Sequence, residues 1–301
     1  MITKRILGIA ASFLTATLPR AQEFRVDCDL VLVPVTVTDG RGASISGLSK
    51  ESFTVLDDRR PQPIAAFYTE DAPCTVGLVM DASGSVRHRL DWEKDAVHTF
   101  LELSNPEDDY FVTTVSSSPV ILAPAGTDLR AIEDQVRTVT AGGWTALFDG
   151  IRLAADQTKR SRRTCRAVFV ISDGIDNHSR CTRHDLIRFL VEADVQVYTI
   201  AIGDTPSGRK GIQLSEDQRG AAFMNDLAAK TGGLSVRARE SDNPSEAAGR
   251  ISVAMRNHYV IGFRASDGDV SGKWHSIQVK IDRSKVNVYA RSGYRLLPGL
   301  Q

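Results

Sequence analysis

The chain has 301 residues, of which 42% are hydrophobic and 25% are charged. These are the proportions of a globular protein, so the composition excludes a wholly disordered chain, and the length favours two domains of about 100–200 residues each. Basic and acidic residues each number 37, which gives a formal net charge of zero. A general electrostatic attraction to nucleic acid or to an anionic membrane is therefore not expected.

The first 21 residues have the pattern of an export signal. Lys4 and Arg5 precede a mostly apolar stretch from Ile6 to Leu18, which is too short to span a bilayer comfortably. We expect residues 1–21 to be removed as a signal peptide, although the exact cleavage site is left open. The mature chain would be periplasmic, secreted or at the cell surface, and the alternative interpretation is a buried N-terminal segment. No other stretch is long and apolar enough to predict a membrane span.

Residues 22–72 have the alternation of β-strands. Valine recurs at every second position of one stretch, namely Val31, Val33, Val35 and Val37. This period of two predicts a strand with one buried face. Two more strands are predicted at Phe53–Leu56 and Ile64–Tyr68, separated by a turn-prone segment.

Residues 73–257 alternate between strand and helix patterns. The predicted strands are Val76–Met80, Tyr110–Val115, Ala167–Ile171 and Val195–Ile202, and the predicted helices lie around Leu90–Leu101, Leu129–Val136, Thr182–Leu190 and Phe223–Lys230. Several of these strands are continuous apolar runs, which is typical of strands covered on both faces. The alternation predicts an α/β fold with a doubly wound, mainly parallel sheet and helices on both of its faces.

Residues 258–301 return to the strand period. Apolar residues alternate over Ile277–Ile281 and again over Val286–Ala290, and the short turn between the two stretches predicts a β-hairpin. Neither terminal segment has enough strands to close a core alone. We therefore expect residues 22–72 and 258–301 to pair into a small β-sandwich-like domain, with residues 73–257 inserted between them.

The four cysteines, Cys28, Cys74, Cys165 and Cys181, allow three pairings if all of them are bridged. Cys165 and Cys181 are expected at opposite ends of one strand, beyond the reach of a disulfide. A Cys28–Cys74 bridge remains open, as does the pairing as a whole. There is no C-x-x-C motif, so a zinc site has little support.

Oxygen-bearing side chains follow two of the predicted buried strands. The run Asp81–Ser85 follows one strand directly, and Asp173 occupies the same place after another, while Thr145 comes from a glycine-rich loop between them. Ligands of open α/β sheets bind beyond the carboxyl ends of the strands. Hard cations such as Mg²⁺ prefer oxygen ligands, so these residues predict a divalent-cation site.

The residues Asp81-Ala82-Ser83-Gly84-Ser85 resemble the D-x-S-x-S signature of von Willebrand factor type A (VWA) domains, and Thr145 and Asp173 match the rest of that family's metal-ion-dependent adhesion site in order and spacing. The resemblance implies that Ser83, Ser85 and Thr145 are hydroxyl ligands of the metal. It implies that Asp81 and Asp173 bind the metal directly or through water. The expected ion is Mg²⁺, with Mn²⁺ and Ca²⁺ as alternatives.

The strand-rich flanks and the run Trp144-Thr145-Ala146-Leu147-Phe148-Asp149 make the whole chain similar to exported VWA-related proteins of acidobacteria, which place the domain between short β-rich segments. The resemblance implies protein–protein interaction or cell adhesion, in which a partner protein offers a carboxylate to the metal. We expect no enzymatic activity, because the chain lacks the G-x-S-x-G, phosphate-loop and H-E-x-x-H motifs. The alternatives are a Mg²⁺-dependent hydrolase and a structural envelope protein whose metal rigidifies loops.

Other polar residues near the predicted site are interpreted as structural. Asp149 fits the first turn of a helix, and Asp176 and Asn177 fit a loop better than a ligand set. His178 is expected to face solvent. Trp144 is expected either to shape a partner surface or to pack beside the glycine-rich loop.

Overall fold

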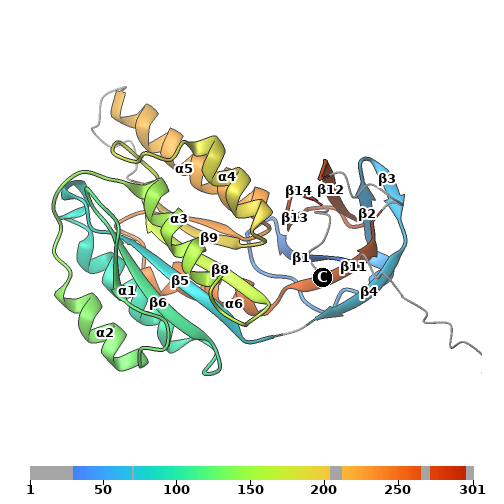
Figure 1. The fold of residues 1–301 in the computed structure, drawn as a ribbon, viewed down its shortest axis with the longest axis horizontal. Coiled ribbons are helices and arrows are strands. Elements are labelled where there is room, and N and C mark those ends of the chain that lie inside the picture. The colour runs from blue at the N-terminus through green and yellow to red at the C-terminus, as the bar shows by residue number, and fades with distance from the viewer. Residues whose placement is uncertain (1–29, 70, 204–211, 266–271, 296–301) are drawn as a thin grey trace, which may run out of the picture.

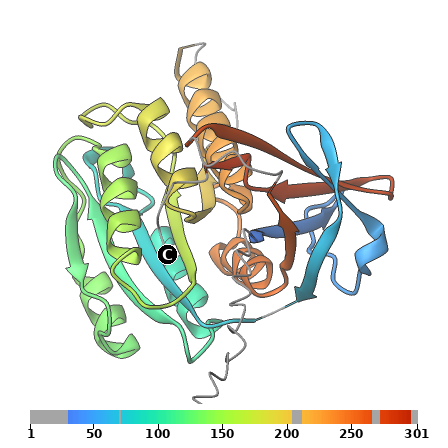
Figure 2. The same cartoon turned by 45° about the vertical axis from the view of Figure 1, so that its right-hand side comes forward.

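The computed structural model describes residues 30–69, 71–203, 212–265 and 272–295. Figures 1 and 2 show an α/β part and a β-rich part lying side by side. The expected signal peptide and Cys28 fall outside the described residues. Within the described residues no helix is long and apolar enough to cross a membrane.

The α/β part is built on a six-stranded sheet in the order β10-β9-β8-β5-β6-β7. Its strands are β5 (Cys74–Asp81), β6 (Asp109–Val115), β7 (Val120–Ala123), β8 (Cys165–Ser172), β9 (Gln196–Ile202) and β10 (Ser235–Ala238). All neighbouring pairs are parallel except β6 and β7. Every residue of β5 and of β9 is buried, as expected of parallel strands covered on both faces.

Helices cover both faces of this sheet (Figure 1). One core contains residues of α1 (Leu90–Glu102), α2 (Leu129–Thr138) and α6 (Pro244–Arg256). The core on the opposite face contains residues of α3 (Leu147–Thr158), α4 (Arg183–Glu192) and α5 (Ile212–Thr231). Two short 3₁₀ helices, η1 (Lys50–Ser52) and η2 (Gly84–Val86), complete the helical elements of the described residues. The predicted α/β class with a doubly wound sheet is therefore confirmed.

The β-rich part consists of two four-stranded sheets in the orders β13-β1-β11-β4 and β14-β12-β2-β3. Their strands are β1 (Leu30–Asp39), β2 (Phe53–Asp57), β3 (Arg60–Gln62), β4 (Ile64–Thr69), β11 (Tyr259–Arg264), β12 (Trp274–Ile281), β13 (Val286–Ala290) and β14 (Gly293–Arg295). The valines of β1 share one core with Phe53, Tyr259 and Ile277. Strands from before and after the α/β part thus form one sandwich, as predicted.

The predicted C-terminal hairpin is wrong. β12 pairs with β2, placing Ile277 opposite Asp57, and β13 pairs with β1, placing Val288 opposite Val37. The turn after β12 therefore carries the chain from one sheet of the sandwich to the other. Each of the two strands pairs with a strand of the N-terminal segment, and β12 also pairs with β14. A two-stranded hairpin alone would be at best marginally stable in water.

A disulfide joins Cys74 and Cys165, whose Cα atoms lie 4.5 Å apart. These residues begin β5 and β8 and are direct partners in the register of the two strands. Cys181 is a free cysteine. The expectation against a Cys165–Cys181 bridge is confirmed, whereas the Cys74–Cys165 pair depends on the strand order, which the sequence left open.

Contacts near Arg291 join the two parts of the molecule. Its Nη1 lies 2.7 Å from Asp194 Oδ1 at the end of α4, and its Nη2 donates to Leu32 O in β1. Next to it, Ser292 N donates to Lys230 O in α5. The sandwich is therefore fastened to the α4–α5 side of the α/β part, whereas the predicted metal site lies beyond the carboxyl ends of β5 and β8.

Candidate metal centre

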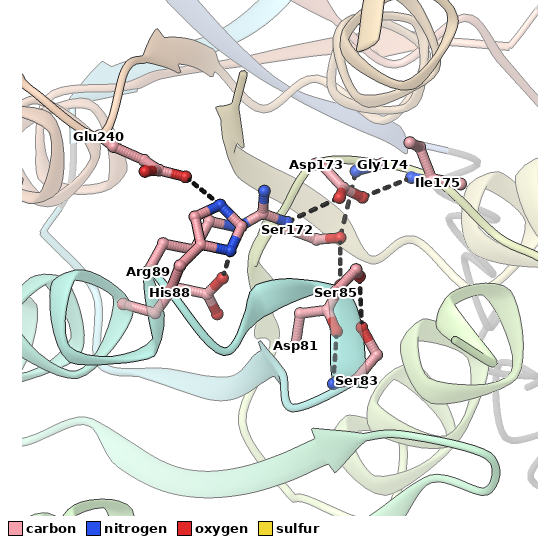
Figure 3. Close-up of polar contacts among 11 residues, drawn as sticks. Asp81, Ser83, Ser85, His88, Arg89, Ser172, Asp173, Gly174, Ile175 and Glu240 are labelled. Atoms are coloured by element: carbon pink, nitrogen blue, oxygen red, sulfur yellow. Dashed lines mark hydrogen bonds and ion pairs between the residues drawn. The ribbon is translucent and has the colours of Figure 1, made fainter. Parts of the chain in front are cut away.

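The predicted site lies where β5 and β8 end (Figure 3). Asp81 is the last residue of β5, and Asp173 directly follows β8. Since the two strands are parallel neighbours, with Met80 opposite Ile171, their carboxyl ends meet at one edge of the sheet. Strand order therefore brings together two acids that are 92 positions apart in the sequence.

Asp81 is fully buried, and both of its carboxylate oxygens accept hydrogen bonds. Oδ1 accepts from Ser83 N and Oδ2 accepts from Ser172 Oγ, each at 2.9 Å. The hydroxyl oxygens of Ser83 and Ser85 lie 2.9 Å apart. Ser83 is buried and Ser85 is exposed, so this part of the site runs from the interior to the surface.

The glycine-rich loop is fixed against the loop after β5. Gly142 N donates to Ala82 O at 2.8 Å, and Gly84 N donates to Gly143 O at 3.0 Å. Gly143 has a φ of +80°, and a Cβ there would lie 2.6 Å from Ser117 Oγ. Glycine is required at this position because the left-handed conformation and the close contact both exclude a side chain.

Thr145 is 4% exposed on that loop and is tied to the loop after Asp173. Its backbone nitrogen donates to Asn177 Oδ1, and its carbonyl accepts from the backbone nitrogens of Asn177 and His178. Among the described residues, its hydroxyl makes no hydrogen bond with the other four predicted residues. The three loops therefore converge, with Thr145 positioned through its backbone.

The loop after Asp173 also caps helix α3. Asp176 Oδ1 accepts from Phe148 N, and Ser179 Oγ accepts from Asp149 N. Asp149 in turn accepts from the backbone nitrogens of Arg180 and Cys181. Free backbone donors at a helix start require such acceptors, so Asp149 and Asp176 are engaged in holding the loop on α3.

Two charged residues that the sequence analysis did not single out lie beside the acids. Arg89 is 8% exposed, and its Nη2 donates to Asp173 Oδ2 at 2.7 Å (Figure 3). Its Nε lies 3.4 Å from Oε1 of Glu93, which is fully buried. The four-residue spacing of Arg89 and Glu93 at a helix start is an available signal, but it normally indicates an exposed pair.

The buried charges of the centre do not balance. With all three carboxyl groups ionised, Asp81, Asp173 and Glu93 carry three negative charges and Arg89 carries one positive charge, which leaves an excess of two. Burial, followed by repulsion from Asp173, raises the pKa of Asp81. Burial, followed by repulsion from Asp81, raises the pKa of Glu93 well above its ordinary value. A divalent cation would neutralise this excess, so the donor set fits such an ion.

The rim of the centre carries an exposed aromatic side chain. Trp144, next to Thr145, is 62% exposed, and its ring lies nearly parallel to that of His178, with 6.3 Å between the centroids. A hollow of about 310 Å³ adjoins it, lined by Ser117, Ser118, Pro119, Asp149, His178 and Arg180. The centre is therefore flanked by aromatic and basic groups that a second molecule can reach.

A second cluster of potential ligands lies in the β-sandwich, away from the predicted site. Ligand atoms of Asp57, Asp58 and His275 all lie within 4.8 Å of one another. His275 Nδ1 is 3.1 Å from Asp58 Oδ2, and Tyr294 Oη donates to Asp57 Oδ2 at 3.0 Å. These contacts join β2, β12 and β14, and the sequence analysis did not anticipate them.

Comparisons with known proteins give similar sequences and structures. The chain is 22% identical over 182 residues to an uncharacterized protein of Borreliella burgdorferi, a match that covers 54% of this chain and 53% of that protein. The chain thus spans about half the length of the curated relative it matches.

The similar solved structures share little sequence with this chain. An aerotolerance-related membrane protein of Bacteroides fragilis is 18% identical, with a TM-score of 0.49, over 60% of this chain and 98% of that one. Proximal thread matrix protein 1 of the mussel byssus, with a zinc-occupied MIDAS motif, is 16% identical, with a TM-score of 0.49, over 67% of this chain and 50% of that one.

A family model gives the assignment of the α/β part. It describes the von Willebrand factor type A domain and matches residues 76–175. This range runs from β5 through β8 to the loop after Asp173, and so contains all five predicted site residues. Residues 76–175 therefore match a von Willebrand factor type A domain, as the signature at Asp81–Ser85 indicated.

Proposed function

We propose that this protein binds a partner protein through a divalent cation held at Asp81, Ser83, Ser85, Thr145 and Asp173. The observation that supports the metal most strongly is the uncompensated negative charge of the buried acids around Asp81. Oxygen donors of this kind suit Mg²⁺, with Mn²⁺ and Ca²⁺ as alternatives. The cation would supply a positive charge at the open side of the site.

A carboxylate of the partner is the proposed complement of the metal. Three of the five donors are neutral hydroxyls, so the bound ion would retain attraction for an external anion. Ser85 lies at the exposed end of the donor set, which supports access from that side. Arg180, which lines the adjoining hollow together with Asp149 and His178, offers an ion pair to a second acidic residue of the partner.

Binding is favoured over catalysis by the state of the acids. Both oxygens of Asp81 accept hydrogen bonds, and Asp173 accepts from Ile175 N and from Arg89. Each oxygen still has a lone pair for a cation, and once both acids serve the proposed metal site neither is available as an independent general base for water. A Mg²⁺-dependent hydrolase and a structural protein with a loop-stabilising ion remain the alternative functions.

Export of the protein is part of the proposal. Disulfides persist in oxidising compartments and are rare in the cytosol, and the Cys74–Cys165 bridge supports a periplasmic, cell-surface or secreted location. Intact mass spectrometry on protein from the native host should show a chain lacking about the first 21 residues. Recovery of the intact N-terminus in the mature protein would contradict export.

Calorimetry with Mg²⁺ and with Mn²⁺ tests the metal site directly. Asp81→Asn keeps the size of the side chain and an acceptor for Ser83 N but removes the charge, so it should weaken metal binding at least about tenfold. Asp134→Asn is the matched control, because this acid is exposed on α2. Equal metal affinity of the wild type and Asp81→Asn would contradict the site.

The adhesive role is tested separately by capture of partners from the native envelope fraction. The wild type and Asp134→Asn should retain the same proteins in Mg²⁺ and release them in chelator, and Asp81→Asn should retain none of them. Partners that ignore chelator would remove the adhesive role and leave the metal site standing. Turnover of phosphoester or peptide substrates in Mg²⁺ that is lost in Asp81→Asn would favour the hydrolase.

A further inference from the structure

Arg89 lies directly beside an acid that is proposed to hold the cation, Asp173. It is the residue before α1, and its backbone is fixed at both ends, since Arg89 N donates to Val86 O and Glu93 N donates to Arg89 O. Its guanidinium, which stays charged in proteins, reaches Asp173 Oδ2 at 2.7 Å. The other oxygen of Asp173 accepts from Ile175 N at 2.9 Å, so Asp173 already has a partner on each oxygen.

Glu93 offers a second acceptor to the same guanidinium. It is fully buried, and its Oε1 lies at the long distance of 3.4 Å from Arg89 Nε. Its Oε2 is buried and has no hydrogen-bond partner among the described residues. A buried carboxylate oxygen without a donor is unfavourable, and the fork of an arginine matches both oxygens of a carboxylate. The carboxylate of Glu93 is therefore an alternative ion-pair partner for Arg89, separate from Asp173.

We infer that Arg89 is a tethered competitor of the divalent cation. It neutralises Asp173 when the metal is absent, and it transfers to Glu93 when the metal binds. This inference rests on the proposed metal site and concerns how that site is regulated. The metal affinity depends on the transfer of the Arg89 guanidinium from Asp173 to Glu93. Arg89 and Glu93 are accordingly positioning residues that act on the metal through Asp173.

Removal of Arg89 distinguishes competition from simple support of Asp173. If Arg89 competes with the cation, Arg89→Met should bind Mn²⁺ at least about tenfold more tightly than the wild type in calorimetry. If Arg89 only orients Asp173, the same substitution should weaken binding. Arg183→Met is the matched control, because Arg183 Nη2 pairs with Asp226 at 2.8 Å on the exposed side of α4, and it should leave the affinity unchanged.

The role of Glu93 is tested by a double-mutant cycle. Glu93→Gln should weaken Mn²⁺ binding about tenfold in the wild-type background, because Arg89 loses its receiving carboxylate. The same change should have a clearly smaller effect in the Arg89→Met background, where only the lost charge of Glu93 acts and there is no guanidinium to receive. An equal effect in both backgrounds would show that Glu93 acts only through its charge, and would overturn the transfer.

A crystal structure of the wild-type protein grown with Mg²⁺ tests the inference without any substitution. Arg89 should contact Glu93 Oε2 and should have left Asp173 Oδ2. A metal-loaded site with Arg89 still on Asp173 would overturn the inference while leaving the proposed function intact. A wild-type protein that binds neither Mg²⁺ nor Mn²⁺ would overturn both.

Discussion

Trp144 illustrates at the residue scale how the proposed metal binding and the proposed partner contact can be separated. The side chain is 62% exposed, yet its backbone nitrogen donates to Ser117 Oγ at 3.0 Å. Exposed aromatic residues on a fixed backbone are frequent anchors of protein interfaces, because they lose little conformational freedom on binding. Its neighbour Thr145 is one of the proposed metal ligands, so one loop serves both functions in the proposal.

Trp144→Ala should therefore weaken partner binding without changing metal affinity. Loss of an interface anchor costs about 2 kcal/mol or more, which is roughly a 30-fold weaker complex. Surface plasmon resonance in Mg²⁺ with the captured partner measures the first effect, and calorimetry measures the second. Val253→Ala removes another exposed apolar side chain, on α6, and should change neither quantity. A loss of metal affinity in Trp144→Ala would contradict the separation.

The raised pKa of Glu93 predicts that the stability of the metal-free protein, measured in chelator, depends on pH. Its pKa is raised in the folded state by burial and then by Asp81, so the folded protein holds the proton more tightly than the unfolded chain. The resulting stability is fully present below the ordinary pKa of about 4.5 and is lost as pH rises through the folded-state pKa. Asp81, whose pKa is also raised, contributes in the same direction.

The free energy of unfolding in chelator should thus fall as pH rises above about 4.5. Glu93→Gln should make the free energy of unfolding fall less steeply with pH, and the remaining pH dependence should come from Asp81. Urea denaturation at a series of pH values would measure both slopes. The exposed control Glu107→Gln should follow the wild type. A steeper fall in Glu93→Gln than in the wild type would show that the sign is wrong.

The elements that build the centre are connected at both ends of β5 and β8. At the carboxyl ends, the loop after β8 caps α3 through Asp176 and Ser179. At the other ends, the Cys74–Cys165 disulfide links the two strands across a sequence separation of 91 residues. The strands that present Asp81 and Asp173 are therefore fixed relative to each other by covalent as well as hydrogen bonds.

Removal of this disulfide should lower the stability of the α/β part. A crosslink that closes a loop of this length restricts the unfolded chain, and its loss typically costs about 2–5 kcal/mol. Cys165→Ser should show this decrease in urea denaturation, and reductant should reproduce it in the wild type. Cys181→Ser, at a free cysteine, is the control and should change stability little. An unchanged midpoint in Cys165→Ser would argue against the bridge.

The whole molecule is an α/β domain inserted in a sandwich that its own flanking segments complete. β1 lies between β11 and β13, and β2 lies between β3 and β12. Tyr259, which follows the α/β domain, contacts the N-terminal segment at several points. Its ring packs on Phe53 and Phe67, and its hydroxyl donates to Ile45 O. The N-terminal strands therefore cannot bury their apolar faces without the residues that follow the α/β domain.

A chain shortened to end at Asn257 should keep the α/β part folded and lose the sandwich. The two cores of the α/β part consist almost entirely of residues from 74 to 255. In contrast, β1 and β4 lose all of their strand partners, and β2 keeps only β3. Limited proteolysis should cut the shortened chain within residues 30–69 and spare the full-length chain there. Persistent protection of residues 30–69 in the shortened chain would contradict this dependence.

The sequence by itself determined the features that depend on neighbouring residues. The period of two in Val31–Val37 and the apolar run Val76–Met80 specify which faces are buried, and these segments are strands in the structure. The pair Thr182 and Asp185 specifies a helix start, and the structure has this hydrogen-bonded cap. Local patterns suffice here because each depends on contacts within a few residues.

Only the tertiary structure decided which distant residues meet. The alternating pattern is the same in a hairpin and in two strands of facing sheets, so it does not distinguish these for Ile277–Ile281 and Val286–Ala290. The structure has facing sheets, because each strand pairs with an N-terminal strand. Cys74 meets Cys165 because β5 and β8 are neighbours. Arg89 lies against Asp173 for the same reason, so a residue whose sequence pattern indicates an exposed ion pair is buried beside the candidate metal site. Strand order depends on the burial of apolar area over the whole chain, so no short stretch of sequence specifies it.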